Sequence, residues 1–189
     1  MLLFLSRIHP KKGIDLLLRV FARPALASQF VLVVAGSGEE AHVSALKNLA
    51  RELGIETRVR WPGHLDNRAK WNAFRTADLF VLPSHQENFG IAVAEALATG
   101  TPVCTTTGVN THAFITQYRA GLVCRDRADD LARALEHWQN LSHGEVLELR
   151  RNARRCFEEN FSVDVASGRL LEAIIESTRA RSGEGGALD

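Results

Sequence analysis

A continuous run of six apolar residues, Phe-Val-Leu-Val-Val-Ala at 30–35, restricts how this chain can fold more than any other feature. A strand that is apolar at every position is buried on both faces, which is typical of parallel sheets covered by helices. Shorter apolar runs recur along the chain. We expect strands at residues 2–5, 30–35, 57–61, 78–82, 102–106 and 122–124.

Between these runs, apolar side chains spaced three and four residues apart predict helices. We expect helices at 13–23, 39–53, 66–76, 89–99, 111–118 and 126–139, one from a Ser142–Glu145 capping box to about 159, and one at 163–179. The helix at 89–99 is apolar almost all round, so deep packing is expected. Six strands alternating with helices predict an α/β fold: a doubly wound, Rossmann-like parallel sheet with helices on both faces. We expect one domain over 1–180 and a disordered tail at 181–189.

Charge and cysteine content exclude several classes of protein. A net charge of +1 argues against a broad nucleic-acid-binding surface. Cys104, Cys124 and Cys156 are odd in number and far apart, which predicts buried free thiols in a reducing compartment such as the cytoplasm. The apolar start at 1–5 is too short for a signal peptide or a membrane span. The histidines lack metal-ligand spacing and no D-x-D pattern occurs, so no metal is expected.

Ligands of doubly wound sheets bind at the carboxyl ends of the strands, so the loops there are the candidate sites. After the first strand come Arg7 and Lys12, with Lys12 directly before the helix that Gly13 opens. Two cations beside a helix N-terminus favour phosphate binding. A solvated basic loop is the alternative.

A glycine-rich turn follows the second strand. Gly36, Gly38 and Ala41 form G-x-G-x-x-A, a variant of the dinucleotide-binding fingerprint. The signal is weak, because the fingerprint belongs after the first strand and because Glu39 and Glu40 would repel a pyrophosphate. The glycines serve either a tight turn or the close approach of a ligand to the backbone.

Two carboxylates flank the start of the helix at 89–99. Glu95 lies within a run of Ala, Val and Leu, where a carboxylate needs a partner: an arginine, solvent at an exposed edge, or a ligand hydroxyl. Glu87 lies in the preceding loop, where solvation is the alternative. Between them, the amides of Asn88, Phe89 and Gly90 could donate to a phosphate. Acceptors for hydroxyls beside donors for phosphate predict a sugar phosphate as the ligand.

Taken together, these segments resemble the C-terminal, donor-binding half of GT-B retaining glycosyltransferases of group 1 (family 4). The resemblance covers about residues 2–138. It is carried by S-R-x4-K-G at 6–13, A-G-S-G after the second strand, W-P-G-H at 61–64, and P-S-x2-E-N-F-G-I-x3-E-A-L-A-x-G-x-P-V at 83–103. The chain departs from the family at Ser6, where glycine is usual, and in the loop at 107–112, which has one glycine and no glutamate.

The resemblance implies a role for each of these residues. Arg7 and Lys12 would hold the donor diphosphate and neutralise the departing nucleotide, which makes them catalytic together with Glu87. Glu87 and the amides at 88–90 would hold the donor sugar, and Glu95 would accept hydrogen bonds from the ribose hydroxyls.

Two further segments complete the implied donor site. Gly36 and Gly38 would let the backbone approach the donor, and the strand end at 61–65 would lie near the base. The implied activity is transfer of a sugar from a nucleoside diphosphate sugar, such as a UDP- or GDP-sugar, to a sugar or lipid-linked acceptor with retention. No cofactor or metal is expected.

The match begins directly at the first strand, so we expect the family's acceptor-binding domain to be missing and the chain to be a fragment. A partner chain that supplies the acceptor domain is the alternative. Competing functions are a non-catalytic nucleotide-sugar-binding subunit, a nicotinamide-dependent oxidoreductase and a nucleotide-sugar epimerase. No nucleic-acid partner and no transmembrane segment are expected, and the expected location is the cytoplasm or the cytoplasmic membrane face.

Overall fold

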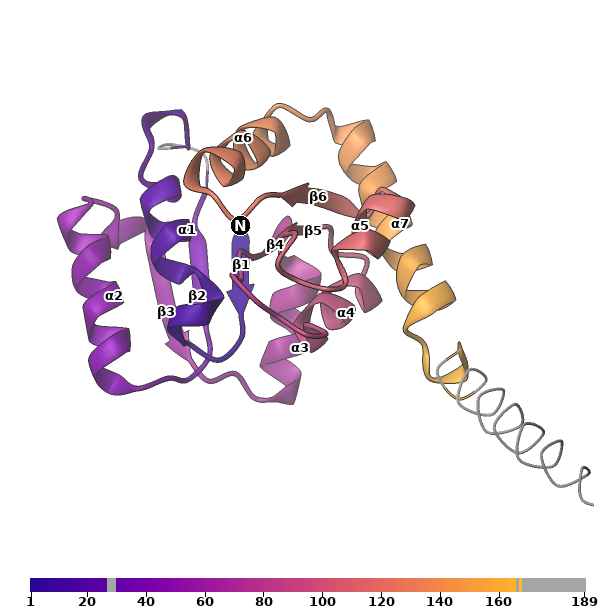
Figure 1. The fold of residues 1–189 in the computed structure, drawn as a ribbon, viewed down its shortest axis with the longest axis horizontal. Coiled ribbons are helices and arrows are strands. Elements are labelled where there is room, and N and C mark those ends of the chain that lie inside the picture. Colours follow the sequence, from indigo (N-terminus) through magenta and orange to yellow (C-terminus); the bar gives the residue numbers. More distant parts are fainter. Residues whose placement is uncertain (27–29, 166, 168–189) are drawn as a thin grey trace, which may run out of the picture.

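The computed structural model describes residues 1–26, 30–165 and 167, and shows one six-stranded, all-parallel sheet (Figure 1). Its strand order is β3-β2-β1-β4-β5-β6. The strands are β1 (Leu2–Leu5), β2 (Leu32–Ala35), β3 (Val59–Gly63), β4 (Leu79–Leu82), β5 (Val103–Thr106) and β6 (Gly121–Cys124). The predicted doubly wound, Rossmann-like sheet is confirmed.

Seven α-helices connect and follow the strands in the described part of the chain. They are α1 (Ile14–Phe21), α2 (Glu40–Glu52), α3 (Asn67–Thr76), α4 (Ile91–Ala98), α5 (His112–Tyr118), α6 (Ala128–Gln139) and α7 (His143–Asn160). Right-handed crossovers place α1 and α2 on one face of the sheet and α3, α4 and α5 on the other. The helix α6 packs on α1, and α7 packs on α4 and α5 (Figure 1).

The core lies around the central strands. Leu2, Leu3 and Phe4 of β1 are fully buried, as is every residue of β4. The ring of Phe80 packs edge-on against Phe74 of α3, with 5.4 Å between the ring centres. Burial of this apolar surface stabilises the fold by roughly 25 cal/mol per Å². It also fixes the strand ends from which the site loops emerge.

Most predicted elements are found with bounds shifted by one or two residues, and two of the differences have a clear physical reason. The third strand begins at Val59 rather than at residue 57, because a short 3-10 turn covers Glu56–Arg58. Its Pro62 is tolerated because β3 is an edge strand. The expectation of deep packing for the helix at 89–99 is wrong at its start, since Phe89 is 49% and Ile91 68% exposed. Only one side of α4 faces the sheet and α7.

The cysteine prediction also needs one correction. Cys104 and Cys156 are buried free thiols, but Cys124 is only half-buried, because it stands at the end of the edge strand β6. The helix expected at 163–179 enters the described region only at 163–165 and 167, which are helical. The tail expected at 181–189 lies outside the described residues.

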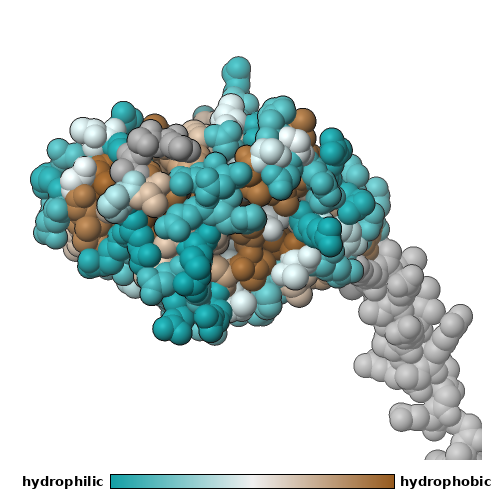
Figure 2. Space-filling model, turned by 90° about the horizontal axis from the view of Figure 1, so that it is seen from above, coloured by the Kyte–Doolittle hydropathy of each residue, from teal (hydrophilic) through white to brown (hydrophobic). Residues whose placement is uncertain are grey.

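The surface seen in Figure 2 is mostly hydrophilic, with the hydrophobic groups in small separate areas. Among the described residues, every helix is too short or too polar to cross a lipid bilayer.

Candidate functional site

The strand order reverses at the boundary between β1 and β4, the two central strands. The connection after β1 leads to one side of the sheet and the connection after β4 leads to the other, so the two loops diverge and leave room for a ligand. Arg7 and Lys12 follow β1, and Glu87 follows β4. The fold therefore brings the three expected catalytic residues to the same edge of the sheet.

Lys12 and Glu87 form an ion pair across this boundary. Lys12 Nζ donates to Glu87 Oε2, and the two side chains are only 13% and 21% exposed. The Glu87 backbone is fixed by the loop after β5, because Glu87 N donates to Gly108 O at 2.9 Å and Asn110 N donates to Glu87 O at 3.0 Å. Glu87 is therefore not a solvated loop carboxylate. The loop at 107–112, which departs from the family pattern in sequence, holds it in place.

Three consecutive amides follow Glu87. The backbone N–H groups of Asn88, Phe89 and Gly90 donate to no acceptor among the residues that the structure describes. Gly90 adopts φ 68° and is the N-cap of α4. Unpaired N–H groups at a helix start, together with the helix dipole, favour a bound anion. The structure thus places donors for a phosphate beside the Lys12–Glu87 pair.

A cavity of about 630 Å³ opens at the carboxyl ends of β1, β2 and β3. It is lined by Leu5, Ser6, Arg7, Gly36, Ser37, Gly38, Glu39, His64, Leu65 and Lys70. The guanidinium group of Arg7 is exposed and has no hydrogen-bonding partner within the described part of the chain. The first-strand loop, the glycine turn and the end of the segment 61–65 border this one cavity, whereas Lys12, Glu87, residues 88–90 and Glu95 are not among its lining residues.

The two glycines of the turn have a purely structural requirement. A Cβ on Gly36, which adopts φ 137°, would lie 1.9 Å from the carbonyl oxygen of Ser6. A Cβ on Gly38 would lie 2.2 Å from the carbonyl oxygen of Ile8. The loops after β1 and β2 also hydrogen-bond, Ile8 N to Ser37 O at 2.8 Å. The tight-turn alternative therefore accounts for both glycines, although both also border the cavity.

Glu95 is paired with a residue that sequence reasoning missed. Lys70 Nζ lies 2.6 Å from Glu95 Oε1, and the two side chains are 24% and 21% exposed. Of the alternatives that the sequence leaves open for Glu95, the arginine partner is replaced by a lysine, and a ligand hydroxyl stays a prediction. The sequence did contain a signal for this lysine, because Asp66 is a typical helix-capping residue. In the structure Asp66 accepts from Ala69 N at 2.7 Å, and the cap places Lys70 in the first turn of α3, at the carboxyl edge of the sheet.

The pairing leaves Glu95 able to bind a further group. Lys70 Nζ contacts Oε1, whereas Oε2 of Glu95 accepts no hydrogen bond from the described residues. Lys70 itself lines the cavity. A ligand hydroxyl that reaches this free oxygen could therefore donate to it while the ion pair stays intact.

His85 joins the loops after β4 and β6. Its Nδ1 lies 2.7 Å from Asp126 Oδ2, and its backbone N donates to Lys11 O at 2.9 Å. These contacts fix the start of the loop that ends in Glu87. Among the described residues, no group of three or more His, Cys, Asp or Glu side chains is arranged to hold a metal ion.

Comparison with known proteins identifies the family. The family model for glycosyl transferases group 1 matches residues 1–156. A D-inositol 3-phosphate glycosyltransferase of Rhodococcus opacus is 36% identical over 186 residues, which are 93% of this chain and 40% of that protein. One of Nocardioides sp. is 37% identical over 158 residues, 72% of this chain and 34% of that protein. The chain thus spans less than half the length of these relatives.

Solved structures share the fold. Anabaena HepE, crystallised with UDP and glucose, superposes with a TM-score of 0.81 at 20% identity, covering 93% of this chain and 48% of HepE. The C-terminal domain of the group 1 glycosyl transferase LpcC from Francisella tularensis gives a TM-score of 0.76 at 18% identity, covering 86% of each chain. The fold is that of the C-terminal domain of GT-B proteins, and the chain belongs to the glycosyl transferases group 1 family.

Proposed function

We propose that this chain is the donor-binding part of a retaining glycosyltransferase and that it binds a nucleoside diphosphate sugar at the carboxyl edge of its sheet. The observation that carries the proposal is the largely buried Lys12–Glu87 pair on the loops after β1 and β4, with Arg7, unpartnered within the described residues, on the same loop as Lys12. It sets two cations and a hydroxyl acceptor on adjacent loops at the carboxyl edge of the sheet.

The donor diphosphate is assigned to the cations and the free amides. Arg7 offers a planar fork for two phosphate oxygens, and Lys12 has two further protons to donate while it holds Glu87. The amides of residues 88–90 add neutral donors at the start of α4. As the bond from the sugar to the diphosphate breaks, negative charge grows on the leaving oxygen. Fixed positive groups at that position stabilise the transition state more than the ground state.

The sugar and the nucleoside are assigned to the two carboxylates. Glu87 accepts from sugar hydroxyls and orients the ring, with Lys12 holding its carboxylate in place. Glu95 accepts from the ribose hydroxyls through the oxygen that Lys70 leaves free. The cavity walls at Gly36, Gly38 and the segment 61–65 then enclose the base.

The relatives suggest which compounds to try first. HepE was crystallised with UDP and glucose, and the curated relatives are named for D-inositol 3-phosphate. We therefore propose UDP-sugars as the donor class and a phosphorylated cyclitol as the first acceptor. An acceptor-binding domain, in the same polypeptide or in a partner, would complete the cleft above the exposed Phe89 and Ile91. The three free thiols fit the expected cytoplasmic location.

Calorimetry with UDP, GDP, ADP and NAD tests the proposal. A nucleoside diphosphate should bind, and NAD should not, which separates this function from an oxidoreductase. Arg7→Ala should weaken the binding at least about tenfold, because a charge-assisted hydrogen bond contributes roughly 1.5–3 kcal/mol. Arg19→Ala is the matched control, since Arg19 is an exposed arginine on α1 outside the cavity.

Chelator should leave the affinity unchanged, because side chains supply the positive charge. Binding of NAD alone, or an Arg7→Ala variant with unaltered affinity, would refute the assignment.

A further inference from the structure

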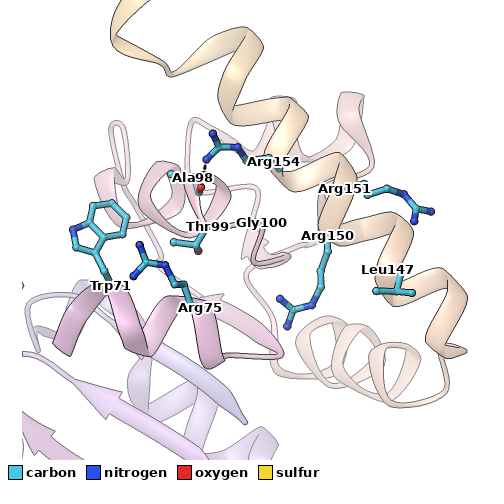
Figure 3. A pocket seen from close by; sticks show the side chains of 9 residues that line it. All are labelled: Trp71, Arg75, Ala98, Thr99, Gly100, Leu147, Arg150, Arg151 and Arg154. Atoms are coloured by element: carbon cyan, nitrogen blue, oxygen red, sulfur yellow. Dashed lines mark hydrogen bonds between the residues drawn. The ribbon is translucent and has the colours of Figure 1, made fainter. Parts of the chain in front are cut away.

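A second, separate cavity lies between the ends of α3 and α4 and the outer helix α7 (Figure 3). Its volume is about 760 Å³, within the range of small-molecule sites. Its walls include Trp71, Arg75, Leu147, Arg150, Arg151 and Arg154. We call it the arginine groove. It shares no lining residue with the cavity at Arg7.

All the charged residues that line the arginine groove are positive. Four guanidinium groups border it, and none of its lining residues is acidic. Arginine stays protonated at every physiological pH, so the four charges cannot be relieved by deprotonation. Arg150 and Arg154 stand four residues apart on α7, where like charges destabilise a helix. Only Arg154 has a carboxylate partner among the described residues, Glu158 at 2.7 Å.

Two of the arginines are anchored and two are available. Arg150 Nη2 donates to the carbonyl of Ala77 at 2.7 Å, and Arg154 Nη1 donates to the carbonyl of Ala98. These bonds fix the guanidinium groups at the C-terminal ends of α3 and α4. Arg75 and Arg151 are exposed and have no partner within the described residues.

Of the two available arginines, Arg75 faces the groove, whereas Arg151 projects from the opposite side of α7 (Figure 3). In Figure 3, Arg75 rises from α3 and Arg150 reaches down from α7 into the space between the helices. Trp71 stands beside Arg75 on α3, and Leu147 of α7 is 40% exposed. A matching ligand carries an anion that accepts several N–H donors and a non-polar or ring-shaped part that packs on the indole.

We propose that the arginine groove is a second anion site that binds the phosphate group of a phosphate ester. Planar guanidinium groups pair with phosphate through two parallel hydrogen bonds, which favours phosphate over a simple halide. The ester's organic part packs against Trp71, which stands beside Arg75 in Figure 3. Such a phosphate belongs either to a soluble phosphorylated compound or to the headgroup of an anionic phospholipid.

The first arm of the test uses glycerol 3-phosphate and nuclear magnetic resonance. The indole N–H signals of Trp61, Trp71 and Trp138 are assigned by tryptophan-to-phenylalanine variants. The Trp71 signal should shift saturably during the titration. The Trp138 signal should stay in place, because Trp138 is a buried residue of α6. Raising the salt concentration should weaken the binding, since it screens exposed charges.

The second arm uses vesicles. The chain is sedimented with vesicles of phosphatidylglycerol and phosphatidylcholine, and with vesicles of phosphatidylcholine alone. A lipid headgroup is the source of the bound phosphate if the chain binds the anionic vesicles only and glycerol 3-phosphate causes no shift of the Trp71 signal. A Trp71 shift without vesicle binding identifies a soluble ester.

Variants establish that the groove is responsible. Arg75→Ala with Arg151→Ala should weaken whichever binding is observed at least about tenfold. Both side chains are exposed and unpaired, so the fold should persist, and the melting temperature checks it. Arg75→Lys with Arg151→Lys keeps the charge, loses the planar fork, and should bind with an intermediate affinity.

The control removes the same charge elsewhere. Arg19→Ala with Arg133→Ala should bind as the unmodified chain does, because these arginines lie on α1 and α6. Three results would overturn the proposal: no binding in either arm, full binding by the Arg75→Ala, Arg151→Ala variant, or an equal loss in the control.

Discussion

The ammonium group of Lys70 lies 2.6 Å from a carboxylate oxygen of Glu95, and both side chains are about three-quarters buried. The pair joins the first turn of α3 to the middle of α4, and its Lys70 member lines the cavity at Arg7. Because Lys70 also lies 5.0 Å from the centre of the Trp71 ring, its position is fixed from two sides. Lys70 thereby both stabilises the Glu95 carboxylate within its Ala-rich helix and fixes its orientation.

This pair predicts a coupling between the two residues in stability. Lys70→Met leaves the Glu95 carboxylate without its partner and should lower the free energy of unfolding by roughly 1–3 kcal/mol. Glu95→Gln should lower the free energy of unfolding less in the Lys70→Met background than in the unmodified chain. Urea unfolding of the four proteins of this cycle measures the coupling. Strictly additive effects would show that the pair contributes nothing.

The two carboxylates of the site should have separable effects on binding. Glu95→Gln should weaken the free nucleoside diphosphate, because Glu95 is assigned to the ribose. Glu87→Gln should spare the nucleotide and weaken the intact sugar donor. Each variant is titrated calorimetrically with UDP and with UDP-glucose. Equal effects of both changes on both ligands would contradict the division.

Gly36 should be the least replaceable glycine of the turn. A Cβ there would lie 1.9 Å from the carbonyl oxygen of Ser6, and the two backbones cannot separate without breaking the Ser6 N to Ala35 O bond. Gly36→Ala should therefore destabilise the fold by more than about 3 kcal/mol. Gly54→Ala is the control, because Gly54 has a positive φ but open space around it.

The control separates a clash from simple backbone strain. Gly54→Ala should cost only about 1–2 kcal/mol, the penalty of a left-handed conformation. Thermal or urea unfolding gives both numbers. A Gly36→Ala variant as stable as Gly54→Ala would show that the loops after β1 and β2 can move apart.

The cysteines should react in a fixed order. A hydrogen bond from the Cys104 thiol lowers the pKa of Cys124, whereas Cys104 has its own pKa raised by that hydrogen bond and by burial. Burial raises the pKa of Cys156 to about 12. Because the thiolate is the reactive form, iodoacetamide at pH 8 should modify half-buried Cys124 first. Peptide mass spectrometry over time reads the order, and early modification of Cys156 would contradict it.

The Cys104→Ser variant tests the cause of this order. It weakens the hydrogen bond to Cys124, so the pKa of Cys124 should rise and its alkylation at pH 8 should slow. The difference in alkylation rate should disappear at a pH above the pKa that Cys124 has in either protein, because the thiolate then predominates in both. An unchanged rate at pH 8 would mean that exposure alone sets the order.

Much of the fold could be predicted because short apolar runs and helical periods are local signals. The run at 30–35 predicts a buried strand, and β2 covers its last four residues. The third strand shifted by two residues because the chain first forms a 3-10 turn at Glu56–Arg58, which no apolar pattern marks. The exposure of Ile91 depends on which side of α4 another element covers, and that is a property of the tertiary structure.

Which residues form the candidate site could largely be predicted, but which of them form ion pairs could not. The rule that loops at the carboxyl edge form the site brings Arg7, Lys12 and Glu87 together without further knowledge. The partners of the two carboxylates could not be derived in this way. Lys12 and Lys70 reach them from 75 and 25 residues away, distances at which only the packing of the sheet decides contacts.

The most direct test of the account is a crystal structure of the chain with UDP. We predict the diphosphate against Arg7, Lys12 and the amides of residues 88–90, with a ribose hydroxyl within hydrogen-bonding distance of Glu95. The Lys70–Glu95 pair should remain intact, because a different oxygen of Glu95 takes the ribose. UDP bound elsewhere on the chain, or a diphosphate that contacts neither Arg7 nor Lys12, would contradict the assignment of the donor site.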